Sequence, residues 1–191
     1  MANQLQGRKV AILIAPAGTE QVEFTEPKKA VERAGATVDV ISAEAGSVQA
    51  VNHDLEPGDT FTVDKAFSQA SPDDYDALIV PGGTVGADKL RGTPEAVAFV
   101  RGFFEQGKPV GVICHGPWTL VEAGVVRGRR LTSFPTLQTD IRNAGGEWVD
   151  EEVVTDQGLV TSRSPDDLPA FCAKLVEEFA EGKHEQQARS V

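Results

Sequence analysis

Short runs of apolar residues recur along the chain and alternate with longer stretches that repeat at the spacing of a helix. An uninterrupted run of four or five apolar residues is typical of a strand that is buried on both faces of a parallel sheet. Such runs predict strands at residues 10–14, 77–80 and 110–113, and shorter apolar segments predict strands at 37–42, 131–133, near 148, at 153–154 and at 159–161. Apolar residues at helical spacing, with proline or glycine at the borders, predict helices at 24–34, 94–104, 117–123, 137–143 and 168–180.

The order of these elements predicts the fold class. Strands that alternate with helices form a mostly parallel sheet with helices on both faces, so we expect an α/β protein. Residues 48–51 and 60–63 interrupt the alternation and predict a hairpin or flap, with Pro57 and Gly58 between its strands. The length of 191 residues suits one domain, which we place at 1–191 with a polar, frayed tail from about residue 183.

The composition narrows the classes of function. The net charge of −11 argues against nucleic acid as a partner, because phosphate binding needs a basic face. No apolar run reaches the length of a membrane span, so we expect no membrane association and a cytoplasmic location. The two cysteines, Cys114 and Cys172, lack the paired spacing of a disulfide framework or a zinc site. We expect no metal and no cofactor, since neither ligand spacing nor a dinucleotide or phosphate-loop motif occurs.

Cys114 is the strongest candidate for chemistry. It ends the apolar run 110–113, and the histidine, glycine and proline that follow it predict a strand, a sharp turn and a helix. A nucleophile elbow of this kind places one side chain beside backbone N–H groups and the positive end of a helix, which predicts a thiol that ionises readily. The alternative is a small buried residue without chemistry, and for Cys172, in an amphipathic helix, that is the preferred interpretation.

His115 is the predicted base for this thiol. The chain has two other histidines, His184 in the polar tail and His53 in the flap, and neither adjoins Cys114 in sequence. Adjacent side chains on a sharp turn point in different directions, which predicts a poorly aligned hydrogen bond. The alternative is that His115 only fixes the turn or lines the pocket. Gly116, which follows it, is a candidate for contact with the substrate.

Two further loops follow strands at the carboxyl edge of the sheet, where ligands bind in such folds. Glu20 and Glu23 would share one face of a helical turn, and one of them would keep its proton and donate a hydrogen bond to the thiolate. The alternative is that glutamates simply suit a helix start. Gly82 and Gly83 could offer N–H groups that form an oxyanion hole together with that of His115, although an ordinary tight turn is the alternative.

Four segments together resemble the ThiJ/PfpI family of the class I glutamine amidotransferase-like superfamily. They are 22–27 (VEFTEP), 78–83 (LIVPGG), 112–117 (VICHGP) and 159–171 (LVTSRSPDDLPAF), and the resemblance extends from residue 9 to about 179. It implies a flavodoxin-like three-layer sandwich that forms dimers or hexamers. It also implies Cys114 as the nucleophile, Glu23 as a protonated carboxyl on its sulfur, and His115 oriented by an acid from another subunit. Asp88 occupies about that place, although taken alone it is typical of a helix cap or a solvated charge.

The resemblance implies several activities for one thiol. Family members act as intracellular proteases, as glyoxalases or deglycases on methylglyoxal and its adducts, as chaperones or as oxidation sensors. Glutamine amidotransferases have a histidine well downstream of the cysteine, and the absence of histidine between His115 and His184 argues against that activity. We expect a cysteine-dependent hydrolase of peptides or small carbonyl substrates with a role in stress protection, active as a homodimer or higher oligomer. The alternative is an oxidation-sensing or chaperone-type protein with little turnover.

Overall fold

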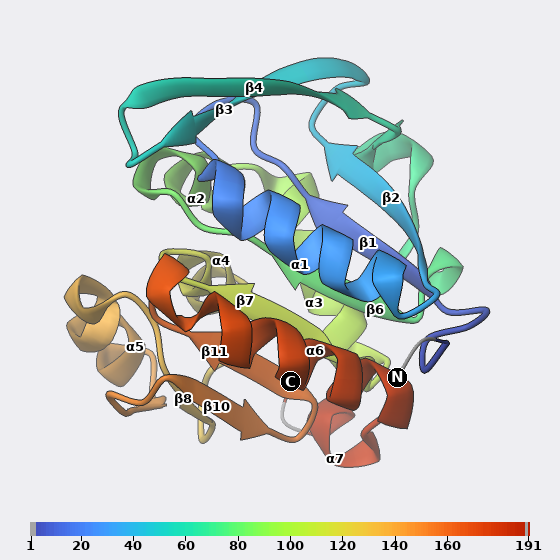
Figure 1. Ribbon diagram of the computed structural model, residues 1–191. Helices are drawn as coiled ribbons and strands as arrows, with labels where there is room; N and C mark the ends of the chain where they lie inside the picture. The colour runs from blue at the N-terminus through green and yellow to red at the C-terminus, as the bar shows by residue number, and fades with distance from the viewer. Residues whose placement is uncertain (1–2, 190) are drawn as a thin grey trace.

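The computed structural model describes residues 3–189 and residue 191, and its centre is a seven-stranded sheet (Figure 1). The strands of this sheet are β1 (Lys9–Leu13), β2 (Thr37–Ser42), β5 (Lys65–Ala66), β6 (Ala77–Val80), β7 (Val110–Ile113), β10 (Val153–Asp156) and β11 (Leu159–Ser162). They lie in the order β10-β11-β7-β6-β1-β2-β5, and only the pair β10–β11 is antiparallel. The predicted mostly parallel sheet is therefore confirmed, with β5 as an edge strand that the sequence did not indicate.

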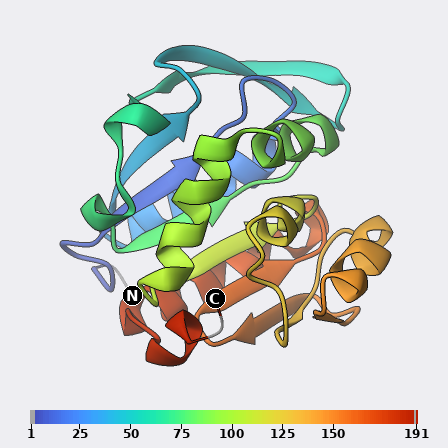
Figure 2. The ribbon, with the colours of Figure 1, turned by 180° about the vertical axis from the view of Figure 1, so that it is seen from behind.

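Helices cover both faces of this sheet. They are α1 (Gln21–Arg33), α2 (Thr84–Arg91), α3 (Pro94–Glu105), α4 (Pro117–Glu122), α5 (Gln138–Asn143), α6 (Leu168–Glu181) and α7 (Glu185–Ala188). Helices α1 and α6 pack side by side in front of the sheet in Figure 1, and Figure 2 shows α3 crossing the opposite face. The three-layer, flavodoxin-like α/β sandwich is confirmed.

Strand β1 shows how an apolar run serves two cores. Ala11 and Leu13 belong to the core that contains Phe103 of α3, whereas Val10 and Ile12 belong to the core under α1 and α6. Neighbouring side chains of a strand point to opposite faces, so a sheet that is covered on both sides requires a fully apolar strand. The carboxyl ends of β1, β6 and β7 meet at one edge, and the loops at this edge hold the candidate chemistry.

The predicted flap is an antiparallel hairpin that lies above α1 at the top of Figure 1. The strands outside the main sheet are β3 (Gly46–Asn52) and β4 (Glu56–Val63) of this hairpin, and the short parallel pair β8 (Arg130–Leu131) and β9 (Glu147–Trp148). Pro57 and Gly58 lie inside β4, so the predicted turn position is wrong. The turn is centred instead on His53 and Asp54, which adopt φ values of 51° and 65°. Aspartate and histidine tolerate this left-handed backbone better than most residues, so the turn needs no glycine.

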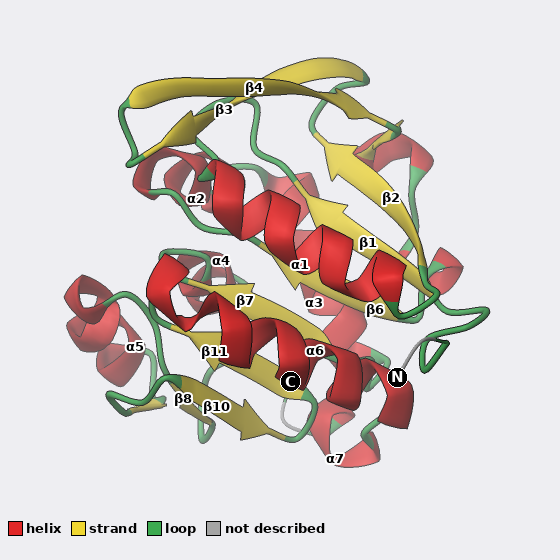
Figure 3. Ribbon diagram, viewed as in Figure 1, coloured by secondary structure: helices red, strands yellow, loops and turns green. Residues whose placement is uncertain are grey.

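Two helices differ from their predictions. Helix α1 begins at Gln21 rather than 24, which places Pro27 inside the helix, where it cannot donate an N–H to the carbonyl of Glu23. Helix α2 follows directly on the loop after β6 (Figure 3), where the sequence predicts no helix. It has only 8 residues and contains Gly86, so its apolar repeat is too short to identify a helix from the sequence. Single 3-10 turns lie at Phe67–Gln69, Pro72–Asp74, Pro135–Leu137 and Pro165–Asp167.

The predicted frayed tail is wrong for residues 183–189. Gln187 in α7 is fully buried, and the N–H of His184 donates to the carbonyl of Gly107 at 2.7 Å. The buried guanidinium of Arg129 donates to the carbonyl of Gln187 at 3.1 Å. A buried cation must find acceptors, and this requirement fixes the C-terminal segment against the domain. Residue 190, also in the predicted tail, lies outside the described residues.

Within residues 3–189 and 191, the search for a helix both apolar enough and long enough to cross a membrane finds none. The cytoplasmic location stays a prediction. Both thiols of the chain, Cys114 and Cys172, are free.

Candidate active site

Cys114 stands at a sharp turn between β7 and α4. Its φ of 61° is rare for a residue with a side chain, and such backbone persists only where the surroundings hold it. The N–H of Cys114 donates to the carbonyl of Ser162 at 3.1 Å, and the carbonyl of Cys114 accepts from the N–H of Phe134 at 2.8 Å. The structure therefore has the strand-turn-helix geometry of the predicted elbow, with a Cys114 side chain that is almost buried.

The loop after β6 brings backbone within contact distance of the thiol. A Cβ on Gly82 would lie 2.5 Å from Glu23 Oε2 and 2.7 Å from Cys114 Cβ, so only glycine fits. The N–H of Gly82 donates to Glu23 Oε2 at 2.8 Å, which corrects the prediction that it serves an oxyanion hole. The N–H groups of Gly83 and His115 point at the sulfur instead, and they remain as the pair that could hold an oxyanion.

Glu23 brings a carboxyl group from the first turn of α1 to the sulfur. The side chain is buried, and it shares a hydrogen bond with Cys114 in addition to the one from Gly82. Burial raises the pKa of Glu23 to about 8, and the negative charges of Glu20 and Asp54 act in the same direction. At neutral pH Glu23 therefore keeps its proton and can donate it in a hydrogen bond to Sγ.

The thiol itself is not acidic in this chain. Burial raises the pKa of Cys114, and the charge of an ionised Glu23 raises it further, whereas the N–H groups of Gly83 and His115 lower it. The predicted ease of ionisation is thus wrong, because removal of the sulfur from water outweighs the backbone dipoles of the elbow. A nucleophilic reaction at this thiol would therefore require a base that takes its proton.

His115 is placed to be that base. Its Nδ1 lies 3.2 Å from Cys114 Sγ, so the left-handed turn brings two adjacent side chains together that were expected to diverge. Burial lowers the pKa of His115, although the charge of Asp54 opposes this shift, and the imidazole is therefore neutral at pH 7. Phe134 stacks on the ring with 4.7 Å between the centroids, and Trp118 meets it edge to face at 5.2 Å.

Two residues near His115 are absent from the sequence-based candidates. Thr84 Oγ1 lies 3.4 Å from His115 Nε2 and donates to Asp54 Oδ2 at 3.1 Å. Asp54 comes from the hairpin turn and Thr84 from the first residue of α2, so neither is close to His115 in sequence. Their one signal is position, since Asp54 lies in a turn and Thr84 directly follows the loop after β6, at the carboxyl edge of the sheet.

Glu20 has a different role from the one predicted. It precedes α1 in extended backbone, so it does not share a helical face with Glu23. Its buried carboxylate accepts the N–H groups of His53 and Asp54 at 2.9 and 3.0 Å. Glu20 therefore holds the hairpin turn over the site, and it lines the cavity beside Cys114.

Gly116 and Asp88 lie outside the group around the sulfur. The N–H of Gly116 donates to the carbonyl of Ile113 at 2.9 Å, and an added Cβ would meet that oxygen, so Gly116 shapes the elbow and its N–H is unavailable to substrate. The side chain of Asp88 is 63% exposed and binds Arg91 at 3.1 Å. Within one chain, Asp88 is therefore a solvated partner of a neighbouring cation.

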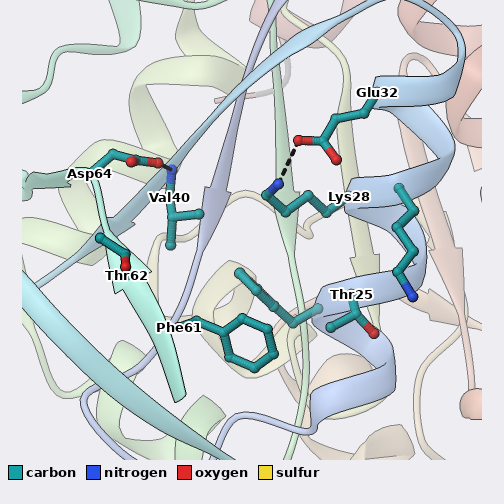
Figure 4. A pocket seen from close by; sticks show the side chains of 9 residues that line it. Thr25, Lys28, Glu32, Val40, Phe61, Thr62 and Asp64 are labelled. Atoms are coloured by element: carbon teal, nitrogen blue, oxygen red, sulfur yellow. Dashed lines mark hydrogen bonds and ion pairs between the residues drawn. The ribbon is translucent and has the colours of Figure 1, made fainter. Parts of the chain in front are cut away.

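The cavity at Cys114 is small, at about 150 Å³. Its lining consists of Glu20, Glu23, His53, Asp54, Gly83, Cys114, His115, Phe134 and Pro165. A larger cavity of about 420 Å³ lies between α1 and β4 (Figure 4), but its lining contains no thiol or imidazole, and Lys28 is paired with Glu32 at 2.5 Å. The reactive groups thus meet in the smaller cavity.

One group of described side chains has donor atoms close enough for a metal ion. Glu178, Glu181 and His184 lie at the end of α6 and beyond it, outside the cavity of Cys114. Glu178 Oε2 and His184 Nε2 are 3.4 Å apart, the distance of an ordinary ion pair. Nothing in this group points to the reaction at the sulfur.

Comparison with known proteins identifies the family. The model of the DJ-1/PfpI family matches residues 8–178. The chain belongs to the DJ-1/PfpI family. It is 44% identical over 166 residues to protein/nucleic acid deglycase 2 of Escherichia coli, which covers 86% of this chain and 93% of that protein. It is 40% identical over 164 residues to YraA of Bacillus subtilis, named as a cysteine protease candidate, with 86% and 94% covered.

The solved structures agree with this assignment. DJ-1beta of Drosophila melanogaster superposes with a TM-score of 0.81 at 27% identity, over 99% of this chain and 95% of that one. The resemblance to the ThiJ/PfpI family is thus confirmed over nearly the whole chain. Its segments 22–27, 78–83 and 112–117 meet at the sulfur, through Glu23, Gly82 and Cys114.

Proposed function

We propose that this DJ-1/PfpI enzyme is a Cys114-dependent hydrolase of small carbonyl adducts, of deglycase type, with a role in stress protection. The observation that carries the proposal is the distance of 3.2 Å between Cys114 Sγ and His115 Nδ1, with a neutral imidazole. The family names of its relatives support the same class of reaction.

The geometry supports a two-stage reaction. In a methylglyoxal adduct the carbon that bears the amine also carries a hydroxyl group and adjoins a ketone. The thiol proton moves from Sγ to His115 Nδ1 and on to the departing amine, while the sulfur takes the place of the amine on that carbon. The proton on this carbon then moves to the ketone carbon through an enediolate, whose oxyanion the N–H groups of Gly83 and His115 stabilise, and a 2-hydroxyacyl thioester results. Water, with His115 as base, hydrolyses the thioester to a 2-hydroxy acid and the free thiol.

The proton on Glu23 makes this sequence feasible in a buried site. An ionised carboxylate beside the sulfur would oppose formation of a thiolate, whereas a protonated carboxyl donates a hydrogen bond to it. Because burial raises the pKa of Glu23 to about 8, the favourable form is present at neutral pH. Glu23 is thus a hydrogen-bond donor in this proposal, and His115 alone moves the thiol proton.

The size of the cavity favours small substrates over extended peptides. Sites for drug-sized ligands usually enclose roughly 300 Å³ or more. The cavity at Cys114 holds about 150 Å³, with Phe134 and Pro165 as apolar walls and Glu20 and Asp54 as polar ones. A two- or three-carbon carbonyl adduct on an amine fits that volume, with the amine directed outward.

The test compares substrates and cysteines. Turnover of methylglyoxal adducts of N-acetyl-lysine is measured beside cleavage of a fluorogenic peptide, for the unchanged protein, Cys114→Ala and Cys172→Ala. We expect turnover of the adduct that Cys114→Ala abolishes and Cys172→Ala retains. Unchanged turnover in Cys114→Ala contradicts the nucleophile, and faster cleavage of the peptide contradicts the substrate class.

A second candidate function uses the same pair of side chains. The protonated Glu23 could donate a hydrogen bond to an oxygen on Cys114, which would stabilise a sulfinic acid and suit an oxidation sensor. Mass spectrometry after mild peroxide treatment tests this function. An oxygen adduct on Cys172 but none on Cys114 would contradict it.

We also propose a homo-oligomer in which the surface beside the site is shared. The guanidinium of Arg91 lies 4.5 Å from the centroid of Trp118, whose ring contacts His115, and Asp88 binds Arg91. A neighbouring copy on this surface would cover one side of the active site. Light scattering measures the assembly, and Trp118→Glu is expected to dissociate it; a monomer in the unchanged protein contradicts the proposal.

A further inference from the structure

One hydroxyl group links the imidazole of His115 to a carboxylate. Thr84 Oγ1 lies 3.4 Å from His115 Nε2 and 3.1 Å from Asp54 Oδ2, to which it donates. The backbone N–H of Thr84 donates to the other carboxylate oxygen, Asp54 Oδ1, at 2.7 Å. Both oxygens of Asp54 are thus acceptors for the same residue, and this arrangement fixes the direction of the hydroxyl proton.

The direction of that proton determines the tautomer of His115. A carboxylate can only accept hydrogen bonds, and a hydroxyl has a single proton to donate. Since Thr84 donates its proton to Asp54, its oxygen can only accept from His115, and the imidazole proton must lie on Nε2. Nδ1 then carries a lone pair, and this lone pair faces Cys114 Sγ at 3.2 Å.

We propose that Asp54 and Thr84 are positioning residues that hold His115 in the tautomer whose Nδ1 can accept the thiol proton of Cys114. The proposal rests on the proposed function, in which His115 is the base. It assigns the orienting acid to the hairpin of the same chain, and not to Asp88 of a neighbouring copy, the place implied by the family resemblance.

The hydrogen-bonded series Asp54–Thr84–His115, called the relay below, also stabilises the cationic form of the imidazole. When the thiol proton moves from Sγ to Nδ1, both ring nitrogens of His115 carry protons and the ring becomes cationic. The negative charge of Asp54 then stabilises the imidazolium through the hydroxyl of Thr84, and Asp54 takes up no proton itself. The proton on Nδ1 later passes to the departing amine, so the relay ends in its starting state.

The hairpin turn holds Asp54 in place for this task. The N–H of Asp54 and that of His53 donate to the buried carboxylate of Glu20, at 3.0 and 2.9 Å. The N–H of Val51 donates to the carbonyl of Thr19 at 2.8 Å, which ties β3 to the segment before α1. These contacts fix the left-handed backbone at Asp54 and direct its side chain toward Thr84.

The sharpest test replaces the carboxylate of Asp54 by an amide. In Asp54→Asn the oxygen still accepts the N–H of Thr84, but the amide nitrogen donates to Thr84 Oγ1. The hydroxyl must then donate to His115 Nε2, and the imidazole proton moves to Nδ1, where it blocks transfer from the thiol. A residue with only a structural role would not invert a tautomer.

The tautomer is read from long-range ¹H–¹⁵N correlation spectra of protein labelled at histidine, with His115→Gln to assign the signal. We expect a proton on Nε2 in the unchanged protein and on Nδ1 in Asp54→Asn, together with a fall in kcat/KM of about 100-fold. A proton on Nε2 in both proteins overturns the proposal. The spectra need no substrate, so they test the relay independently of the proposed function. An unchanged tautomer with persisting turnover would contradict the relay alone, and a changed tautomer without turnover would contradict the proposed function alone.

Two variants of Thr84 keep the test independent of Asp54. Thr84→Val removes the hydroxyl at nearly constant volume, and we expect a mixture of tautomers and a reduced kcat at little changed KM. Thr84→Ser retains the hydroxyl and should restore both the Nε2 proton and the rate. If His115 in Thr84→Val carries its proton on Nε2 alone, the relay is contradicted. This result holds even if Asp54→Asn does not fold.

Asp88→Asn is the matched control, since it makes the same carboxylate-to-amide change on α2, the helix that contains Thr84. This variant should keep the Nε2 proton and the pH profile of the unchanged protein. A change of tautomer in Asp88→Asn together with none in Asp54→Asn would assign the orienting acid to a neighbouring copy and overturn the proposal. Thermal melts confirm that each variant is folded before its spectrum is interpreted.

Discussion

The surroundings of the two thiols differ far more than the thiols themselves. Cys114 lies at a strained turn, whereas Cys172 lies within the regular helix α6 beside a cavity whose lining includes Glu26 and Arg33 but no histidine. Burial raises the pKa of both thiols, for Cys172 to about 11. Only Cys114 has an imidazole nitrogen, at 3.2 Å. The comparison teaches that burial raises the pKa of both thiols, and that the proposed reaction at Cys114 depends on its neighbouring imidazole.

The largest effect expected from this comparison concerns turnover. Cys114→Ala should reduce kcat/KM for a methylglyoxal adduct by more than about 10³-fold, because the residues that line the cavity include no second thiol and no hydroxyl group. Cys172→Ala should leave kcat/KM within a factor of about two, since Cys172 does not line the cavity at Cys114. Steady-state kinetics give kcat/KM for both variants, and thermal melts serve as the folding control. Equal losses of kcat/KM in the two variants would contradict the difference between the two thiols.

A glycine tests how tightly the region around Cys114 is built. In Gly82→Ala the new Cβ would meet Glu23 Oε2 and the Cβ of Cys114, and we expect a loss of about 2 kcal/mol in the free energy of unfolding. Gly92→Ala is the control, because its backbone is right-handed and the nearest atom lies 3.3 Å from the new Cβ. Chemical denaturation gives both values. Equal free energies of unfolding for the two variants would show that the residues around Gly82 move to accommodate the new Cβ without loss of stability.

The pH dependence distinguishes the base from the carboxyl. His115 must be neutral to accept the thiol proton, and its lowered pKa puts the acid limb of kcat/KM below the ordinary histidine range. Glu23 must be protonated, so kcat/KM should fall about tenfold per pH unit above about 8. Glu23→Gln cannot ionise and should lose this alkaline limb while keeping the acid limb. An alkaline limb that persists in Glu23→Gln contradicts the assignment.

The smallest expected effect is on the alkylation of the free enzyme. At pH 9 Glu23 is ionised and its charge raises the pKa of Cys114, so Glu23→Gln should increase the alkylation rate of Cys114 by about tenfold. Cys172 serves as the internal control, because burial, Glu26 and Arg33 are the causes that shift its pKa. Intact mass spectrometry over time gives both rates. A parallel increase at Cys172 would indicate loosening of the fold.

The turns and loops at the carboxyl edge of the sheet, which form the candidate site, could be predicted from the sequence to different degrees. The elbow at Cys114 and the loop at Gly82 follow from local sequence, because an apolar run that stops at glycine or proline indicates its own turn. The hairpin turn was misplaced, since Pro57 and Gly58 mark turns by composition while Glu20 holds the real turn at His53 and Asp54 from outside the hairpin. A turn that is stabilised by a distant carboxylate leaves no local signal.

The sequence by itself determined the layered α/β fold and the elbow with Cys114 and His115, because periodicity and turn residues act between neighbours in the chain. It offered both Glu20 and Glu23 as carboxyl partners of the thiol, and only the family resemblance favoured Glu23. Only the tertiary structure decided that Gly82 binds Glu23, that Thr84 links Asp54 to His115, and that burial raises the pKa of the thiol. Each of these depends on burial or on contacts between distant segments. Desolvation and hydrogen-bond direction are properties of the assembled site, and a one-dimensional pattern contains neither.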